Sequence, residues 1–394
     1  MSKKTYIPTD ANYFRYEGRI LYRDGAAYLG HTNSSVSVRT DAGTVTFYIF
    51  TGDNEPVNDP SLRIYINGCY LGDHILSGPG YATYHYEHRT GGEESISHIR
   101  SQVILTDKWS DAEDGFFRGI ADGSRPYELI IDGFDAGKIY DVKILKHTEA
   151  AMSHIGVAGV KTDGGELMTL AGGGRDREED ACRTKVEFIG DSITCGYGIH
   201  SPLSEDNYTL WDEDGEDNYA AIIAKKMNWD ARWISASGYG MYMNYEGVRE
   251  ENVPKLYPCV NWFVDPQIRI DPGEFEPEFI FINLGTNDSN HIAEGDNVSR
   301  FKESYTDFLE LLKKYHPKAK IICMIGTVCD NMYPYIKEAA DKVTAKGYKD
   351  IYTFELTFFT PQSDGVADGH PTLTTHRKDA ESVLRFMRES GLIG

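Results

Sequence analysis

Hydrophobic and polar positions alternate in short runs through the first 150 residues. Apolar side chains recur at every second position in Val36–Thr40, and β-branched and aromatic residues dominate Thr44–Phe50. The run Leu62–Ile66 ends in Asn67-Gly68, a dipeptide that favours tight hairpin turns. This period-two alternation, broken by turns, predicts an antiparallel β-sandwich of jelly-roll type. The polar stretch 85–122 lacks the pattern and predicts a long loop or a hairpin insertion.

Beyond a glycine-rich, charged junction, predicted strands alternate with predicted helices. The apolar runs that predict strands are Val186–Ile189, Ala231–Ser235, Phe279–Leu284, Lys320–Ile325 and Asp350–Glu355. Apolar residues at three- and four-residue steps predict helices over 218–227, 298–315, 333–345 and 374–388. The alternation predicts a parallel sheet covered on both faces, with ligands at the carboxyl ends of its strands. We therefore predict a β-sandwich at 1–160, a junction at 161–184 and an α/β domain at 185–394.

Residues with catalytic potential follow four of these strands. Gly190-Asp191-Ser192 comes after the first strand, and Ser235-Ala236-Ser237-Gly238 ends the second. Gly285-Thr286-Asn287-Asp288 follows the third, and Asp368-Gly369-His370 comes shortly after the fifth. Each segment alone fits a structural role, such as a helix cap or a turn. Because the carboxyl ends of parallel strands meet at one edge of a sheet, the four segments together predict one active site.

These residue types fit acyl transfer to a serine. A hydroxyl is a weak nucleophile near neutral pH, so Ser192 needs a base within hydrogen-bond reach. His370 is the predicted base, since an imidazole takes up and returns protons near that pH. The backbone N–H groups of Ser192 and Gly238 and the side-chain amide of Asn287 are predicted donors to the oxyanion. The predicted catalytic residues are therefore Ser192, Gly238, Asn287 and His370.

The four segments resemble the sequence blocks of the SGNH hydrolases, or GDSL-type esterases, from about Lys185 to the end of the chain. A narrower resemblance, carried by Lys146–Ala150 and Phe188–Gly198, is to carbohydrate esterase family 2. Members of that family place a jelly-roll domain before an SGNH domain and remove acetyl groups from plant polysaccharides such as xylan and mannan. The resemblance implies a flavodoxin-like, three-layer α/β domain after the β-sandwich. It also implies a carbohydrate O-acetyl esterase that acts on acetylated oligosaccharides without metal or organic cofactor.

The segment before His370 departs from most SGNH hydrolases. Most members carry an aspartate three positions before the histidine, where this chain has Ala367. The segment resembles the family-2 form, in which some members use a Ser–His dyad and a backbone carbonyl orients the imidazole. We therefore expect a Ser192–His370 dyad, with Asp368 as the alternative third member. Gly369 stands where family-2 members often carry a tryptophan, so an aromatic sugar contact must come from elsewhere.

The insertion between Gly238 and Pro277 is rich in aromatic residues. Because it begins at the predicted oxyanion glycine, its first turns are expected to line the cleft. Tyr239 and Trp262 are the candidates for stacking on a sugar ring, and packing of the insertion is the alternative role. We expect the β-sandwich to form one wall of the cleft, and a separate carbohydrate-binding role is the alternative.

No metal site is predicted, although His85, His88 and His98 are a possible set of metal ligands. The six cysteines include no CxxC pair. His85, His88 and His98 lie in the polar stretch and are expected at the surface. Asp212–Asp217 does not match the twelve-residue pattern of a calcium loop and is expected to be a solvated acidic loop.

The net charge and the cysteines limit the binding partners and the cellular compartment that the sequence predicts. The chain has 40 Lys and Arg against 61 Asp and Glu, a net charge of −21, which disfavours binding to nucleic acid or to anionic membranes. Scattered cysteines and the absence of a visible export signal predict a cytoplasmic protein with reduced thiols. The oligomeric state is not predicted.

Two other functions fit the same residues. One is an acyl-hydrolase acting on lipids or thioesters, which the many tyrosines and the lack of an amphipathic lid disfavour. The other is a glycan-binding protein without turnover, which the presence of all four catalytic residue types disfavours.

Overall fold

The computed structural model describes residues 3–52, 58–77, 96–106, 124–170, 182–201, 208–359, 365 and 367–394. Its contacts divide the chain into two compact units, residues 1–179 and 180–394. Each unit has a hydrophobic core of its own. Within the described residues, no helix has the length and apolar character needed to cross a membrane.

The first unit contains two antiparallel sheets. In one sheet the order is β3-β4-β12-β6-β10-β9, and β1 also pairs with β12. These strands are β1 (Lys3–Tyr6), β3 (Ile20–Arg23), β4 (Ala26–Leu29), β6 (Thr44–Thr51), β9 (Arg100–Leu105), β10 (Arg125–Asp132) and β12 (Ile155–Asp163). In the other sheet the order is β13-β5-β11-β7-β8, and β2 also pairs with β5. Its strands are β2 (Arg15–Glu17), β5 (Ser34–Thr40), β7 (Ser61–Ile66), β8 (Cys69–Ile75), β11 (Tyr140–Lys146) and β13 (Leu167–Met168).

Both sheets contribute to one buried core. Alternate residues of β5, Val36 and Val38, and of β6, Phe47 and Ile49, belong to the same cluster. Successive side chains of a strand point to opposite faces, so this alternation places one face of each sheet inside. The unit is therefore a two-layer arrangement of antiparallel sheets, as the period-two pattern predicted. It extends beyond residue 160, because β12 continues to Asp163 and β13 pairs with β5.

One strand lies where the pattern predicted a loop or hairpin insertion. Within 85–122, β9 forms the edge of a sheet and pairs with β10. Its Ile104 and Leu105 are exposed, so the strand lacks the apolar-inside alternation that reveals the others. His85 and His88 lie outside the described residues, and His98 Nε2 lies 3.6 Å from an oxygen of Asp135.

The second unit is built on a five-stranded parallel sheet in the order β15-β14-β18-β19-β20. The strands are β14 (Lys185–Gly190), β15 (Asp230–Ser235), β18 (Phe279–Asn283), β19 (Lys320–Ile325) and β20 (Ile351–Glu355). They match the five predicted strands. The α/β architecture with a parallel sheet is thus confirmed.

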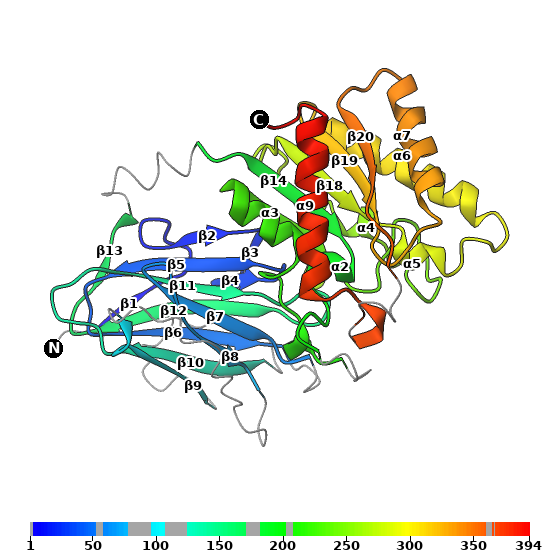
Figure 1. Cartoon of the computed structure of the whole chain (residues 1–394). Helices are drawn as coiled ribbons and strands as arrows, with labels where there is room; N and C mark the ends of the chain where they lie inside the picture. The colour runs from blue at the N-terminus through cyan, green and yellow to red at the C-terminus, as the bar shows by residue number, and fades with distance from the viewer. Residues whose placement is uncertain are drawn as a thin grey trace. The chain divides into compact units, whose positions relative to one another are not determined.

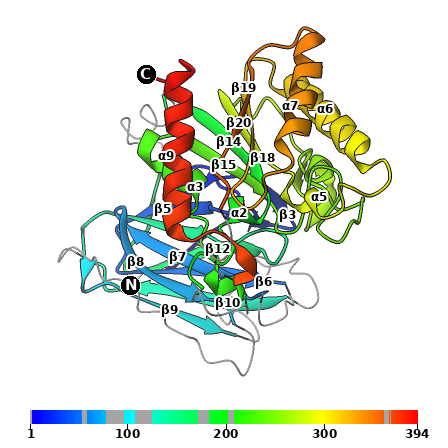
Figure 2. The same cartoon turned by 45° about the vertical axis from the view of Figure 1, so that its right-hand side comes forward.

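Helices cover both faces of this sheet (Figures 1 and 2). On one face lie α3 (Tyr219–Met227) and α9 (Leu373–Glu389), and on the other lie α6 (Asn297–Tyr315) and α7 (Tyr333–Ala345). Side chains of β19 show the same division. Met324 packs in the cluster that includes Leu384 of α9, whereas Cys323 contacts Tyr305 of α6.

Short elements complete the unit and surround the ends of its strands. They are α2 (Ser192–Cys195), η4 (Leu210–Asp212), α4 (Val253–Leu256), β16 (Cys259–Asn261), β17 (Asp265–Arg269), α5 (Thr286–Ser289) and η5 (Ala367–Gly369). The insertion after Gly238 contains α4 and the β16–β17 hairpin. It is therefore folded rather than an open loop.

Candidate active site

The ends of three adjacent strands bring together the residues that the sequence placed there. In the register of the sheet, Gly190 of β14 lies opposite Ser235 of β15 and Asn283 of β18. Ser192, Gly238 and Asn287 follow these positions by two to four residues. The shared register therefore places the three predicted residues at one edge of the sheet.

Ser192 occupies the first position of α2, directly after β14. Asp191 caps this short helix, because its Oδ1 accepts a hydrogen bond from the Ile193 N–H at 3.1 Å. A Cβ at Gly190 would lie 2.0 Å from Thr194 Oγ1, so this strand end has room only for glycine. The tight turn places the Ser192 side chain beyond the strand end.

His370 reaches Ser192 from a segment 178 positions away in the chain. His370 Nε2 lies 2.7 Å from Ser192 Oγ, which is the hydrogen bond that a serine nucleophile and its base require. His370 follows η5 and precedes α9, whose cap is the Thr372 side chain. The structure thus brings the predicted serine and histidine into contact.

Asp368, the alternative third member, contacts a residue that the sequence analysis gave no role. Its carboxylate accepts a hydrogen bond from Tyr197 Oη at 2.7 Å. Asp368 has a φ of 52°, in the left-handed region. The ring of Tyr197 stacks on His370, with centroids 4.1 Å apart and planes 30° apart. Tyr197 belongs to Gly196-Tyr197-Gly198, in which neither periodicity nor a charge marks it as functional.

Gly238 and Asn287 follow the two strands that flank β14 in the sheet. Gly238 has a φ of 79°, which favours glycine, and the N–H of the next residue, Tyr239, donates to Ala236 O in a tight turn. The Asn287 side-chain amide donates to Tyr239 O at 2.9 Å and lies 3.5 Å from Asp191 Oδ2. This amide therefore links the turn after β15 to the cap of α2.

Asp288 fixes the backbone that follows Gly238. It is fully buried, and its two oxygens accept hydrogen bonds from the N–H groups of Met241, Tyr242 and Met243 at 2.7 to 3.1 Å. Burial raises the pKa of Asp288 to about 6, and the three N–H groups oppose this shift. The sequence marked Asp288 only as part of its motif, and the backbone contacts give it a positioning role.

The insertion's aromatic residues differ in how much of each ring is accessible. Tyr239 is half-buried and its ring contacts Phe263 edge-on, with centroids 5.8 Å apart. Trp262 is half-buried in the turn between β16 and β17. Tyr245 is 53% exposed, and a Cβ at Gly238 would lie 2.9 Å from its Cδ1. Tyr245 is thus the most exposed ring of the three, and it packs directly on Gly238, the predicted oxyanion glycine.

A second histidine, His376, lies close to His370 and is uncharged. His376 of α9 is fully buried, and its Nδ1 accepts a hydrogen bond from the Tyr219 N–H at 3.2 Å. Burial and the nearby charge of His370 lower the pKa of His376 to about 3. His376 therefore stays neutral near neutral pH.

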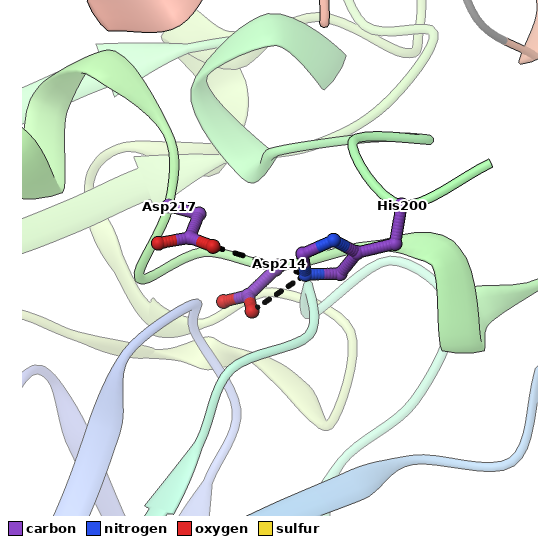
Figure 3. Close-up of side chains that lie close together, drawn as sticks. All are labelled: His200, Asp214 and Asp217. Carbon is purple, nitrogen blue, oxygen red and sulfur yellow. Dashed lines mark hydrogen bonds and ion pairs between the residues drawn. The ribbon is translucent and has the colours of Figure 1, made fainter. Parts of the chain in front are cut away.

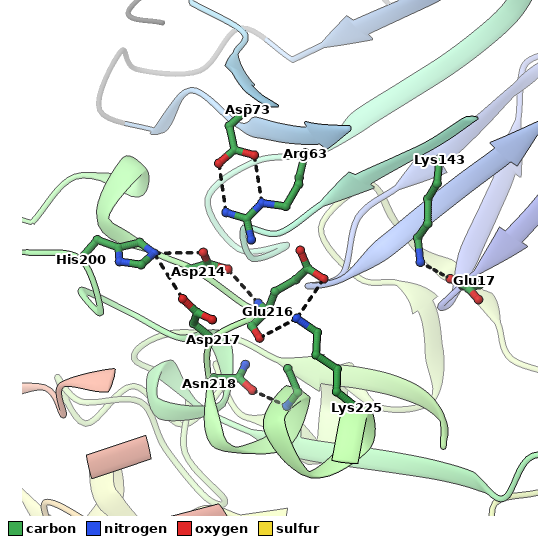
Figure 4. A network of polar contacts seen from close by, with 11 residues as sticks. Glu17, Arg63, Asp73, Lys143, His200, Asp214, Glu216, Asp217, Asn218 and Lys225 are labelled. Atoms are coloured by element: carbon green, nitrogen blue, oxygen red, sulfur yellow. Dashed lines mark hydrogen bonds and ion pairs between the residues drawn. The ribbon is translucent and has the colours of Figure 1, made fainter. Parts of the chain in front are cut away.

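The acidic loop 212–217 is not the solvated surface that its charges predicted. Glu213, Asp214 and Glu216 are all buried. Their oxygens have partners nearby, since Glu213 accepts from Tyr208 Oη and Asp214 accepts from the Glu216 N–H at 2.9 Å each. Figure 4 shows this network continuing to the ion pair of Glu216 with Lys225. The prediction was wrong because charge alone does not reveal such local partners.

His200, Asp214 and Asp217 form a cluster of metal-ligating residue types (Figure 3). One ligand atom from each lies within 4.8 Å of the others. His200 Nε2 lies 3.0 Å from an oxygen of Asp214 and 3.9 Å from one of Asp217. His200 and the two carboxylates contact one another directly, and we assign no metal to this cluster.

Comparisons with known proteins follow the same division of the chain. Residues 188–378 match the model of the GDSL-like Lipase/Acylhydrolase family. Cellulase/esterase CelE of Acetivibrio thermocellus is 29% identical over 314 residues, which are 75% of this chain and 36% of that protein. An acetylxylan esterase / glucomannan deacetylase of Cellvibrio japonicus is 24% identical over 212 residues, which are 52% of this chain and 56% of that protein. The chain thus spans between about a third and just over half of the length of these relatives.

A solved structure resembles the whole chain. It is an acetyl xylan esterase (Est2A) from the rumen bacterium Butyrivibrio proteoclasticus, with a TM-score of 0.74 and 18% identity over 99% of both chains. At this identity the likeness concerns the fold. The arrangement of a β-rich unit before an α/β unit therefore occurs in a protein of known structure.

Proposed function

We propose that this protein is a carbohydrate O-acetyl esterase, and the match of residues 188–378 to the model of the GDSL-like Lipase/Acylhydrolase family supports this proposal. Its substrates are acetylated oligosaccharides of the xylan or mannan type, the classes named for the relatives above. The observation that carries the proposal is the 2.7 Å hydrogen bond between Ser192 Oγ and His370 Nε2. We assign the β-rich unit to the jelly-roll type.

The reaction begins with attack of Ser192 on the acetyl carbonyl. His370 Nε2 accepts the hydroxyl proton while Oγ bonds to the carbonyl carbon, which gives a tetrahedral oxyanion. Collapse of this intermediate breaks the bond to the sugar oxygen, and the imidazolium returns the proton to that oxygen. The products of this half are the free sugar hydroxyl and acetyl-Ser192.

Water completes the cycle by the same route. His370 takes a proton from water, the resulting hydroxide attacks acetyl-Ser192, and collapse releases acetate while the proton returns to Ser192 Oγ. The Ser192 N–H, the Gly238 N–H and the Asn287 amide hydrogen that is not donated to Tyr239 O stabilise both oxyanions. Every proton in this cycle moves through His370, and the cycle needs no cofactor.

Tyr239 and Trp262 remain our proposed contacts for the sugar, and the accessible ring of Tyr245 joins them. Flat aromatic faces stack well on the apolar faces of pyranose rings. Tyr239 carries a second link to the site, because its carbonyl accepts the hydrogen bond from Asn287. Sugar bound at Tyr239 is therefore coupled to the position of an oxyanion donor.

Acetate release from acetylated xylo- and manno-oligosaccharides tests the proposal. Removal of the nucleophile in Ser192→Ala is expected to lower kcat by at least about 1,000-fold, as for other serine hydrolases. Thr194→Ala is a matched control, since this buried hydroxyl on the same helix contacts Tyr219 and not His370. Preferential cleavage of long-chain acyl esters would instead support the lipase-like alternative. Tight oligosaccharide binding without acetate release by the wild type would support the glycan-binding alternative.

A further inference from the structure

We propose that Tyr197 is the positioning residue of the catalytic base: its ring holds the imidazole of His370 in place, and Asp368 acts by anchoring Tyr197 rather than by contacting the imidazole as a triad carboxylate. The proposal rests on the esterase mechanism above, in which His370 is the base. It assigns a role to a tyrosine that lies in the segment Phe188–Gly198 but was given no function from the sequence.

Tyr197 is tied to the nucleophile through the backbone. Gly196 ends α2 in the left-handed conformation, with a φ of 88°, and this turn directs the chain back toward the start of the helix. The N–H groups of Gly196 and Tyr197 then both donate to Ser192 O, at 3.1 and 3.0 Å. The position of the Tyr197 ring is therefore set by the same four-residue helix that presents Ser192.

The contacts of Tyr197 form a closed loop of interactions with Ser192 and His370. Ser192 Oγ bonds to His370 Nε2, the His370 ring stacks on Tyr197, and the Tyr197 N–H returns to Ser192 O. A fourth contact joins Tyr197 Oη to Asp368, two residues before the base. Movement of the imidazole away from Ser192 thus breaks its contact with a ring that is fixed to Ser192 itself.

Tyr197 is itself held between two rings. Tyr208 stacks on it with centroids 3.6 Å apart and planes only 11° apart. Two rings stacked this closely on one tyrosine must lie on opposite faces, so Tyr197 is sandwiched between Tyr208 and His370. The ring has little freedom to tilt, which lets it serve as a fixed surface for the imidazole.

The stacking also suits the charge that develops during the reaction. When His370 accepts the proton of Ser192 it becomes an imidazolium, and the face of an aromatic ring attracts a cation. The neighbouring His376 stays neutral and adds no repulsion at working pH. The ring of Tyr197 therefore favours the transition state over the ground state, which raises kcat rather than lowering KM.

The Tyr197–Asp368 hydrogen bond is the weaker part of the arrangement. Asp368 is exposed, and water competes for hydrogen bonds at the surface. Tyr197→Phe, which keeps the ring and loses this bond, is therefore expected to lower kcat only about two- to five-fold. Tyr197→Leu, which loses the ring, is expected to lower kcat about 10- to 100-fold with KM within about two-fold of wild type.

Asp368→Asn distinguishes the anchor from a triad member. An asparagine keeps a carbonyl oxygen that can accept from Tyr197 Oη, so kcat is expected to fall no more than in Tyr197→Phe. The double variant Tyr197→Phe/Asp368→Asn is expected to be no slower than Tyr197→Phe, because both changes act on one hydrogen bond. A carboxylate that orients the imidazole directly would instead cost about 10,000-fold when changed to the amide.

The experiment measures kcat and KM for these variants on an acetylated xylo-oligosaccharide and on p-nitrophenyl acetate, with thermal midpoints as a check of folding. Tyr208→Leu gives a second measure if Tyr197→Leu does not fold: it loosens the sandwich, and a smaller fall in kcat is expected. Unchanged kcat in the ring-removing variant that folds would overturn the proposal. So would a rise in KM alone, which would make Tyr197 a sugar contact, or a 10,000-fold loss in Asp368→Asn.

Wild type and Ser192→Ala separate this proposal from the proposed function. If the wild type hydrolyses acetyl esters and Ser192→Ala does not, any failure above concerns Tyr197 alone. If the wild type cleaves no ester, the mechanism fails, and the role of Tyr197 fails with it.

Discussion

The two sides of Ser192 are held in different ways. On the oxyanion side, Gly238 and Asn287 follow strands that pair directly with β14, and Asp288 fixes the backbone beyond Gly238. On the base side, His370 follows a short 3-10 turn, and its contacts include two side chains: the ring of Tyr197 and the hydroxyl of Ser192. Donors set by the sheet need little further support, whereas a base on a connecting segment depends on the side chains around it.

This difference predicts where a single substitution does most damage. A hydrogen-bond donor to the oxyanion stabilises the charge of the transition state directly. Its loss is therefore expected to lower kcat strongly, however the donor is held in place. The residues that position the oxyanion donors and the base act on the reaction indirectly. The exposed aromatic rings are expected to affect only substrate binding. Three substitutions on the oxyanion side test this order and complement the Tyr197 series on the base side.

Asn287→Ala is expected to have the largest effect of the three. The variant loses the side-chain donor to the oxyanion, which costs about 100- to 1,000-fold in kcat with little change in KM. It also removes the link from Tyr239 O to the cap of α2. Steady-state kinetics on p-nitrophenyl acetate measure the loss, because this substrate needs no sugar contacts.

Asn290→Ala is the matched control for that measurement. Asn290 is exposed at the end of the same short helix, and its amide has only a long contact of 3.5 Å with Tyr245 O. Its kcat is expected to stay within about two-fold of wild type. Equal kcat in Asn287→Ala and in this control would remove Asn287 from the oxyanion site.

Asp288→Asn tests the residue that positions the oxyanion loop. An asparagine presents an N–H₂ group to one of the three backbone donors, so the loop loses a hydrogen bond and meets an opposing donor. We expect kcat to fall about 10- to 100-fold, less than for Asn287→Ala, because Asp288 acts through the backbone at Met241–Met243. Asp296→Asn, at an exposed ion pair with Arg300, is the control and should be near wild type.

The same variant gives a pH dependence with a defined sign. Burial raises the pKa of Asp288 from 3.8 to about 6, so the folded protein binds this proton more tightly than the unfolded chain. The free energy of unfolding of the wild type therefore falls, by about 3 kcal/mol, as the pH rises from about 4 to about 6, and Asp288→Asn lacks this contribution. Urea unfolding of both proteins at pH 4, 5, 6 and 7 measures it. A stability difference that does not change with pH would mean that the folded carboxyl titrates like an unfolded one.

The same comparison shows why the sequence predicted one side of the site better than the other. Ser192, Gly238 and Asn287 stand just after apolar runs that predict strands, and parallel strands bring their carboxyl ends together. Their placement needed only the order of strands and helices. His370 was predicted from its chemistry, and its contact with Ser192 fits that prediction. The predicted roles of these residues await the variants described above.

The contacts of Tyr197 and of the acidic loop 212–217 could not be predicted from the order of strands and helices. The position of Tyr197 over His370 depends on the left-handed turn at Gly196 and on a segment more than 170 residues away. The partners of the buried Asp214 include His200 and the loop's own backbone, and no periodicity reveals them. Regular sheet geometry can be predicted from spacing, whereas contacts between side chains of irregular segments require coordinates.

Tyr245→Ala is expected to have the smallest effect and to change binding rather than chemistry. Tyr245 is exposed over Gly238, and its backbone N–H donates to Gly238 O at 2.9 Å, a bond that the substitution keeps. Loss of a stacking ring should raise KM for a long acetylated oligosaccharide about three- to ten-fold, leaving kcat and the hydrolysis of p-nitrophenyl acetate unchanged. Tyr239→Ala and Trp262→Ala, measured alongside, rank the three rings, and Tyr22→Ala controls for loss of an exposed tyrosine on the β-rich unit. A fall in kcat on p-nitrophenyl acetate would show that Tyr245 supports the oxyanion turn. Tyr245 would then be a positioning residue, like Asp288, rather than a substrate contact.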